Sequence, residues 1–211
     1  MNASARNLLL ANGATLAAAL AFDWDSGWLL WPYWIQSVII GWYARRRMLA
    51  LRQFTTKGLS SNGRRVPEDA AGKRSVANFF AMHYGFFHLG YLVFLWQQHA
   101  LAGSALDLLV LVACGVSFAL SQRQTYAAQH AADLRGKPNL GTLMFMPYLR
   151  VVPMHVAIIA GGLLPDIGGV WLFVALKTAV DLALDAIDRK LALRSADKVA
   201  AAAELRTESQ T

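Results

Sequence analysis

A small set of polar and ionisable side chains interrupts the apolar stretches of this sequence, and their chemistry needs an explanation. Neutral imidazole combined with carboxylate is a ligand set for zinc, iron and similar divalent metals. His83, His155 and Asp181 would supply two imidazoles and one carboxylate, and would leave coordination positions open. The full set of polar residues is Asn12, Gln36, Asn78, His83, Tyr84, His88, His155, Lys177, Asp181 and Asp185.

A polar stripe is expected near the end of the chain. Lys177, Asp181 and Asp185 follow one another at intervals of four, so on a helix they share one face. Lys177 and Asp181 can then neutralise each other, or the stripe can relay protons or ions. Asp181 and Lys177 are therefore candidate catalytic residues and, equally, candidates for a structural ion pair.

The segment "KRSVANFFAMHYGFFHLGYLVFLW", residues 73–96, is apolar and yet contains two histidines. His83 and His88 are five residues apart, so on a helix they point about 140° away from each other. Tyr84 shares a face with His88 and can hydrogen-bond to it. We take His83, together with His155 and Asp181, as candidate acid–base catalytic residues. Tyr84 is a supporting candidate that orients an imidazole.

No dense metal-binding motif such as H-E-x-x-H accompanies the three candidate ligands. A bound divalent metal ion therefore competes with two other interpretations. The histidines can hydrogen-bond between helices as structural glue, at about 0.6–2 kcal/mol each, or the polar groups can form a proton or ion pathway. The sequence leaves open an enzyme acting on a lipophilic small molecule and a non-enzymatic carrier or scaffold.

The elements that position these residues are predicted to be membrane helices. Of the 211 residues, 56% are hydrophobic and 16% are charged, whereas a soluble domain carries about a quarter charged residues. Apolar runs alternate with short charged segments, which is typical of an all-α polytopic membrane helix bundle. Six transmembrane helices are predicted, at Asn7–Phe22, Gly27–Ala44, Val76–Trp96, Leu106–Leu120, Leu143–Leu164 and Gly169–Ala186.

The positive charges indicate an orientation. Residues 23–26, 97–105 and 165–168 contain no Lys or Arg, whereas nine lie between Arg45 and Arg74. This positive-inside bias places both termini in the cytoplasm of a bacterial inner-membrane protein. We therefore interpret the net charge of +7 as topology and expect no nucleic-acid partner. The oligomeric state is left open.

Four of the polar residues are predicted to lie at similar depth. At about 1.5 Å per residue, Gln36 and His83 lie about 13 Å from the inner boundary and Asp181 about 12 Å. His155 is a little shallower, five residues past Arg150. The sequence thus predicts a polar layer in the cytoplasmic half of the bilayer, formed by four different helices.

Segments outside the predicted spans have their own signatures. The first 22 residues also resemble a signal peptide ending at Ala19–Ala21, whose cleavage would leave five spans. Residues 45–75, rich in Gly, Ser and charge, predict a mobile basic cytoplasmic loop that lies against anionic lipid headgroups. Residues 189–211 predict a charged, Ala-rich cytoplasmic tail that extends the last helix beyond a bundle formed by residues 1–188.

The blocks "WPYWIQSVIIGWYARRRML", "NFFAMHYGFFHLGYLVF", "PYLRVVPMHVAIIAGG" and "LFVALKTAVDL" together resemble a bacterial multi-pass membrane family, the domain-of-unknown-function family six-four-nine-eight. The likeness runs from about Trp31 to Asp181. In the family pattern Glu commonly stands where this chain has Gln36, so the resemblance implies a neutral amide in place of a carboxylate. It implies no activity. Its blocks fall on Tyr33, Trp34, Gln36, Gly41, His83, Tyr84, Gly85, Pro147, Tyr148, Arg150, His155, Lys177 and Asp181.

Overall fold

The computed structural model describes residues 3–22, 26–98, 101, 104–160 and 166–208, and in these residues six helices account for almost all regular structure. The all-α prediction with six helices is confirmed, and the core of each predicted span lies in one helix. The last four residues of the predicted fifth span lie outside the described residues. The helices are α1 (Ala3–Ala21), α2 (Ser26–Ala50), α3 (Ala70–Gln98), α4 (Ala105–Asp133), α5 (Leu140–Ala160) and α6 (Asp166–Glu208).

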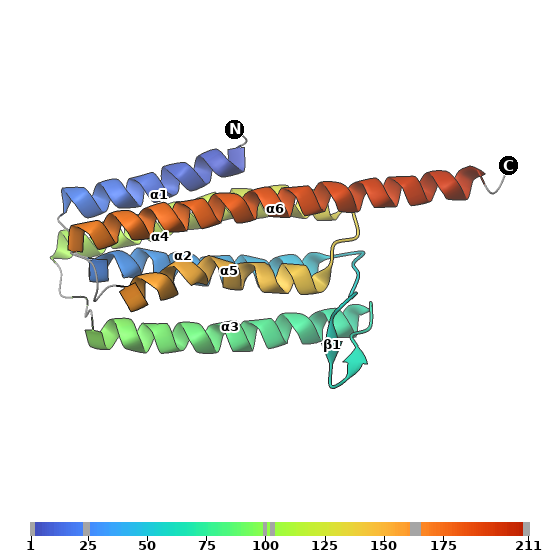
Figure 1. Ribbon diagram of the computed structural model, residues 1–211, viewed down its shortest axis with the longest axis horizontal. Coiled ribbons are helices and arrows are strands. Elements are labelled where there is room, and N and C mark those ends of the chain that lie inside the picture. The colour runs from blue at the N-terminus through green and yellow to red at the C-terminus, as the bar shows by residue number, and fades with distance from the viewer. Residues whose placement is uncertain (1–2, 23–25, 99–100, 102–103, 161–165, 209–211) are drawn as a thin grey trace.

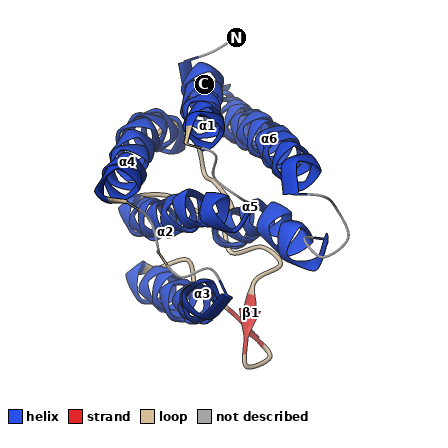
Figure 2. Cartoon of the chain, turned by 90° about the vertical axis from the view of Figure 1, so that its left-hand side faces the viewer, coloured by secondary structure: helices blue, strands red, loops and turns tan. Residues whose placement is uncertain are grey.

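The helices form an elongated bundle with α2 in its middle (Figures 1 and 2). Helix α2 packs against α3, α4, α5 and α6, while α1 packs against α4 and α6. Because α2 packs against four helices, polar groups on the faces that it turns toward them are shielded from the surroundings of the bundle. The position of α2 explains how Gln36 and Arg47 are buried on a helix with an apolar sequence.

Helices α2 and α3 approach each other closely at Gly41. A Cβ atom at this position would lie 2.5 Å from the ring of Tyr84, which is too close for any side chain. The Tyr84 hydroxyl donates to the carbonyl oxygen of Ser37 at 3.1 Å, one turn before the glycine. The absence of a side chain at Gly41 thus lets an aromatic ring of α3 lie flat against α2.

Helix α4 begins at a capping box, in which the Ser104 side chain accepts from the Asp107 backbone and the Asp107 carboxylate accepts from the Ser104 backbone. This pairing satisfies amide groups that the first turn of a helix otherwise leaves free. The helix continues to Asp133, thirteen residues beyond the predicted span end at Leu120. Its last three turns therefore bring additional polar residues alongside α6.

Residues 45–75, for which a mobile loop is predicted, contain regular structure, and their mobility stays a prediction. Their two ends belong to α2 and α3, and their middle forms a β-hairpin of β1 (Ser60–Ser61) and β2 (Arg64–Arg65). Asn62 and Gly63 both have positive φ, at 50° and 74°. An Asn-Gly pair with this geometry is the preferred two-residue turn of a hairpin.

The hairpin segment is fixed to the connection between α4 and α5. The Thr55 amide donates to the carbonyl of Pro138, and the Leu140 amide donates to the carbonyl of Thr55, both at 2.9 Å. The Glu68 carboxylate accepts from Lys137 Nζ at 2.8 Å and from the Thr56 amide at 3.1 Å. Two segments about eighty residues apart in sequence are thereby joined at one end of the bundle.

Helix α6 is continuous across the predicted boundary between bundle and tail, and it extends well past the other helices (Figure 1). On its way it contacts the α4–α5 connection, where Ser195 Oγ accepts from the Lys137 amide at 2.7 Å. A Cβ atom on Gly136 would lie 2.7 Å from the same oxygen, so the connection passes close to α6 only because residue 136 is glycine.

Candidate functional site: buried ion pairs along α6

One face of α6 carries a buried row of ionisable side chains. Lys177, Asp181 and Asp185 lie at intervals of four residues, and Asp188 follows on the same face. All four residues are at most 9% exposed. The spacing argument predicted the first three. Lys177 pairs with Asp181 and Asp185 pairs with Arg189 within α6 itself. Residues of neighbouring helices complete two clusters, one around Asp181 and one around Asp188.

The first cluster, here the Asp181 cluster, consists of Asn12, Arg150, Lys177 and Asp181. Lys177 Nζ donates to Asp181 Oδ2 at 2.7 Å, so the predicted neutralisation of this pair is present. Asn12 of α1 donates to the same oxygen at 3.4 Å, and Arg150 of α5 reaches the other oxygen at 3.5 Å. The ammonium of Lys177 also lies 4.9 Å from the ring centroid of Tyr33. The cluster joins three helices and contains two cations for one carboxylate.

The second cluster, here the Arg47 cluster, consists of Arg47, Gln129, Asp133 and Asp188. Arg47 of α2 forms a bidentate pair with Asp133 of α4, at 2.6 and 2.8 Å. Its remaining terminal nitrogen donates to both oxygens of Asp188 on α6, at 2.9 and 3.0 Å. Gln129 also donates to Asp188, at 2.9 Å. This cluster has the opposite balance, with two carboxylates for one cation.

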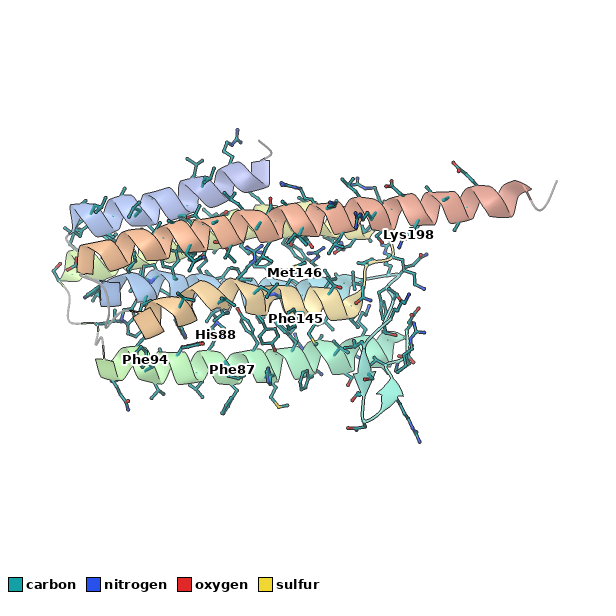
Figure 3. All side chains as sticks on the ribbon, in the orientation of Figure 1. Phe87, His88, Phe94, Phe145, Met146 and Lys198 are labelled. Carbon is teal, nitrogen blue, oxygen red and sulfur yellow. The ribbon has the colours of Figure 1, made fainter. Side chains whose placement is uncertain are left out.

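A cavity of about 40 Å³ lies between the two clusters. A cavity needs roughly 10–15 Å³ by this measure to hold one water molecule, so the space suits about three waters or one small ion. Figure 3 labels Met146 of α5, one of the apolar lining residues. The lining residues are Ile40, Ala44, Arg47, Gln122, Gln129, Leu143, Met146, Pro147, Arg150, Leu184 and Asp188.

The two histidines of α3 face different ways, as their five-residue spacing predicts. His88 is 4% exposed, and its Nδ1 lies 2.8 Å from the carbonyl oxygen of Tyr84, with the two rings stacked 4.1 Å apart. Figure 3 labels His88 between α3 and the rest of the bundle. The predicted contact of Tyr84 with His88 is therefore present, although it uses the backbone oxygen and not the hydroxyl.

His83 is exposed on the outer side of α3. Among the described residues, its contacts are with residues outside the Asp181 cluster. Its Nδ1 lies 2.9 Å from the Tyr148 hydroxyl of α5. Its ring stacks on Phe79 at 5.4 Å and meets Phe87 edge-on at 5.0 Å. The depth argument placed His83 in one layer with Gln36 and Asp181, but equal depth does not give equal direction, and only Gln36 and Asp181 are buried.

The predicted metal set of His83, His155 and Asp181 stays a prediction. The side chain of His155 lies outside the described residues, although its backbone belongs to α5. Within the part of the chain that the structure describes, no three His, Cys, Asp or Glu side chains are grouped so that they could hold a metal ion. Elemental analysis of the purified protein and of the His155→Ala variant tests this prediction directly.

Sequence reasoning missed most of the Arg47 cluster. Arg47 was counted among the cytoplasmic basic residues, and Asp133 and Gln129 lie beyond the predicted end of the fourth span. Arg150 lies in the block "PYLRVVPMHVAIIAGG", for which the sequence predicts no ion-pair partner. The available signal was Asp188, because it continues the face of Lys177, Asp181 and Asp185 and requires a cation when that face is buried.

The comparisons with known proteins give one match. The model of DUF6498, described as a family of unknown function, matches residues 1–198. Neither the curated proteins nor the solved structures include a match to this chain. Because the match covers 198 of the 211 residues, including both clusters, the chain belongs to the DUF6498 family of unknown function.

Proposed function

We propose that this protein is an integral membrane helix bundle that handles protons or ions through the Asp181 cluster. Helices α3 and α4 are long and apolar enough to cross a membrane. Only 22% and 11% of their most apolar windows are buried inside the structure, whereas the core helix of a soluble protein would be mostly buried. Large apolar surfaces of this kind mark contact with lipid or another protein.

Large apolar side chains, whose exposure to water is unfavourable, form much of the outer surface of α3 and α4. On α3, Met82, Phe86 and Trp96 are 72%, 73% and 63% exposed, and on α4, Leu109 and Val112 are 64% and 62% exposed. The placement of Lys and Arg in the sequence supports a bacterial cytoplasmic membrane with both termini on the inner side. The hairpin would then lie on that side, near anionic headgroups.

The observation that carries the proposed function is the composition of the Asp181 cluster. Charges within a membrane are costly, so they are paired and commonly belong to ion or proton pathways. Asp181 is 1% exposed and is shared by two cations, so protonation of its carboxylate would release both Lys177 and Arg150. A carboxylate with two exchangeable cationic partners suits a carrier that binds and releases a proton.

Proton flux into sealed vesicles tests the proposal. The purified protein is reconstituted in liposomes that contain a pH-sensitive dye, and a potassium gradient with valinomycin sets the membrane potential. We expect wild-type protein to accelerate dye acidification and the Asp181→Asn variant to fall to the rate of protein-free vesicles. Asp181→Glu, which retains the carboxylate, should keep part of the flux.

Asp197→Asn is the matched control, because Asp197 is exposed on the C-terminal part of α6 and its variant should behave as wild type. Monodisperse elution and unchanged helix content would show that each variant is folded. Wild-type flux equal to that of empty liposomes, or equal flux from wild type and Asp181→Asn, would overturn the proposal and favour a purely structural role.

A further inference from the structure

We propose that the cavity between the two clusters is a binding site for a small monovalent anion, such as chloride or nitrate, held by Arg150 and Gln122. This inference rests on the proposed function, because it assigns a second ion to the same buried site. Its evidence is separate, since it comes from the bonding of Arg150 and the shape of the cavity. Arg150 and Gln122 enter the cavity from α5 and α4.

Arg150 is a buried guanidinium with few bonds. Its side chain is 9% exposed, and a guanidinium has five N–H donors. Its one hydrogen bond among the described residues is the 3.5 Å contact with Asp181. Asp181 is already neutralised by Lys177 at 2.7 Å. The remaining donors of Arg150 have no partner among the described residues, and Arg150 lines the cavity. These donors are therefore free to bind an anion that enters it.

The cavity fits such an acceptor in size and charge. Its volume of about 40 Å³ admits one small ion. Gln122 adds amide N–H donors on the side of α4. Asp188 also lines the cavity, but its carboxylate is held by Arg47 and Gln129. The negative charge of Asp188 disfavours a dianion such as sulfate. We therefore expect the site to prefer an anion that carries a single charge.

The apolar part of the lining refines the expected selectivity. The side chains of Ile40, Leu143, Met146 and Leu184 provide no hydrogen bonds, so an ion that lies against them loses part of its water. Weakly hydrated anions lose water more readily, and we expect nitrate and bromide to bind at least as well as chloride. Formate presents the same single charge and should compete, whereas sulfate should not.

Equilibrium dialysis of the detergent-purified full chain against radiolabelled chloride tests the site. Wild type should bind chloride saturably, at about one ion per chain, with competition from nitrate, bromide and formate. Arg150→Met should bind at least about tenfold more weakly, because a hydrogen bond to a charged group contributes about 1.5–3 kcal/mol. Gln122→Leu, which leaves every ion pair intact, should weaken binding several-fold.

Arg52→Met is the control, because Arg52 is an exposed residue outside the cavity, and its variant should bind as wild type does. Linear uptake that never saturates, or saturable uptake that is the same in Gln122→Leu and Arg150→Met as in wild type, would overturn the inference. Competition by anionic phospholipid but not by nitrate would also overturn it, because the ligand would then be a headgroup.

The two proposals fail separately. Loss of proton flux in Asp181→Asn without saturable chloride binding in wild type would refute the anion site alone. Saturable binding that depends on Arg150, together with unchanged flux in Asp181→Asn, would refute proton handling alone.

Discussion

The two buried clusters use the same kinds of residue but are bonded very differently. Arg47 makes four hydrogen bonds of 2.6 to 3.0 Å to two carboxylates, whereas Arg150 makes one of 3.5 Å to a carboxylate that it shares. Bidentate pairs are stronger and more rigid than single contacts. Arg47 therefore fixes α2, α4 and α6 relative to one another, while Arg150 retains the capacity to bind something else.

The difference teaches that burial alone does not identify a functional charge. Both arginine side chains are 9% exposed, so exposure cannot tell them apart. What separates them is how many donors are already used. A saturated arginine is part of the scaffold, and an undersaturated one beside a cavity is a candidate for chemistry. The following predictions test this distinction, from the largest expected effect to the smallest.

Arg47→Met should have the largest effect on stability. Removal of one partner from a buried ion pair costs about 3–5 kcal/mol, because the remaining charge is left without compensation. Here two carboxylates would lose their cation. Thermal unfolding in detergent, followed by circular dichroism, measures the change, with Arg52→Met as the control. A loss below about 1 kcal/mol would mean that Asp133 and Asp188 find other partners, and the scaffold role of Arg47 would be wrong.

Arg150→Met should be much milder in the same experiment, at roughly 1 kcal/mol, because its one contact with Asp181 is long, at 3.5 Å, and should lie at the low end of what a hydrogen bond contributes. Lys177 stays 2.7 Å from Asp181 and keeps that carboxylate neutralised. The comparison between clusters depends on this contrast. If both arginine variants lose the same stability, the two clusters are equivalent and the argument from bonding fails.

Asn12→Leu should change stability by about 0.6 kcal/mol, the average for a hydrogen bond between helices in a membrane. The Asn12 contacts to Asp181 and Thr178 are long, at 3.4 Å each, and its buried side-chain oxygen has no partner among the described residues. Leucine replaces the amide with a similar volume. A larger loss would show that α1 contributes to the charge balance of the cluster.

Glu68 forms exposed ion pairs, in contrast to the two buried clusters. Its substitution should therefore have the smallest effect on stability. Its hydrogen bond from Lys137, with further bonds from Thr56 and Thr55, lowers the pKa of Glu68 to about 2. Because the folded pKa is depressed below its usual value of 4.5, the contribution of Glu68 is complete above pH 4.5 and is lost as pH falls toward 2. Glu68→Gln should not shift the thermal midpoint measurably at neutral pH.

The amide resonance of Thr56, which donates to Glu68, should report this titration in an NMR experiment. Its chemical shift should change with a midpoint near pH 2 in wild type and should not titrate in Glu68→Gln. A midpoint near 4.5 would mean that the hairpin does not hold Glu68 as the structure shows.

The sequence predicted the helices well because apolar runs long enough to form them are local features. It also predicted the Lys177–Asp181 pair, since a four-residue spacing on a helix is sufficient. The Asn62–Gly63 pair was a recognisable hairpin signal within a segment that we interpreted as a mobile loop from its composition. There, local turn chemistry was more informative than the content of Gly, Ser and charge.

Contacts between helices that are distant in the chain could not be predicted from the sequence. Arg47 meets Asp133 and Asp188 across 86 and 141 residues, and such contacts depend on how the helices are arranged in space. The positive-inside rule already accounts for a basic residue at this position, so the sequence analysis predicts no ion-pair partner for Arg47. His83 shows a related limit, because counting residues along a helix gives the height of a side chain and leaves its angle around the axis undetermined.

The junction at Ser195 has a mechanical consequence. This one hydroxyl links the long final helix to the α4–α5 connection through the Lys137 amide, and the side chain of Lys137 in turn links that connection to Glu68 beside the hairpin. Three segments that are far apart in the chain are thus coupled in series at one end of the molecule. A displacement of the projecting part of α6 would therefore strain the hydrogen bond at Ser195 first and, through Lys137, the contact with Glu68.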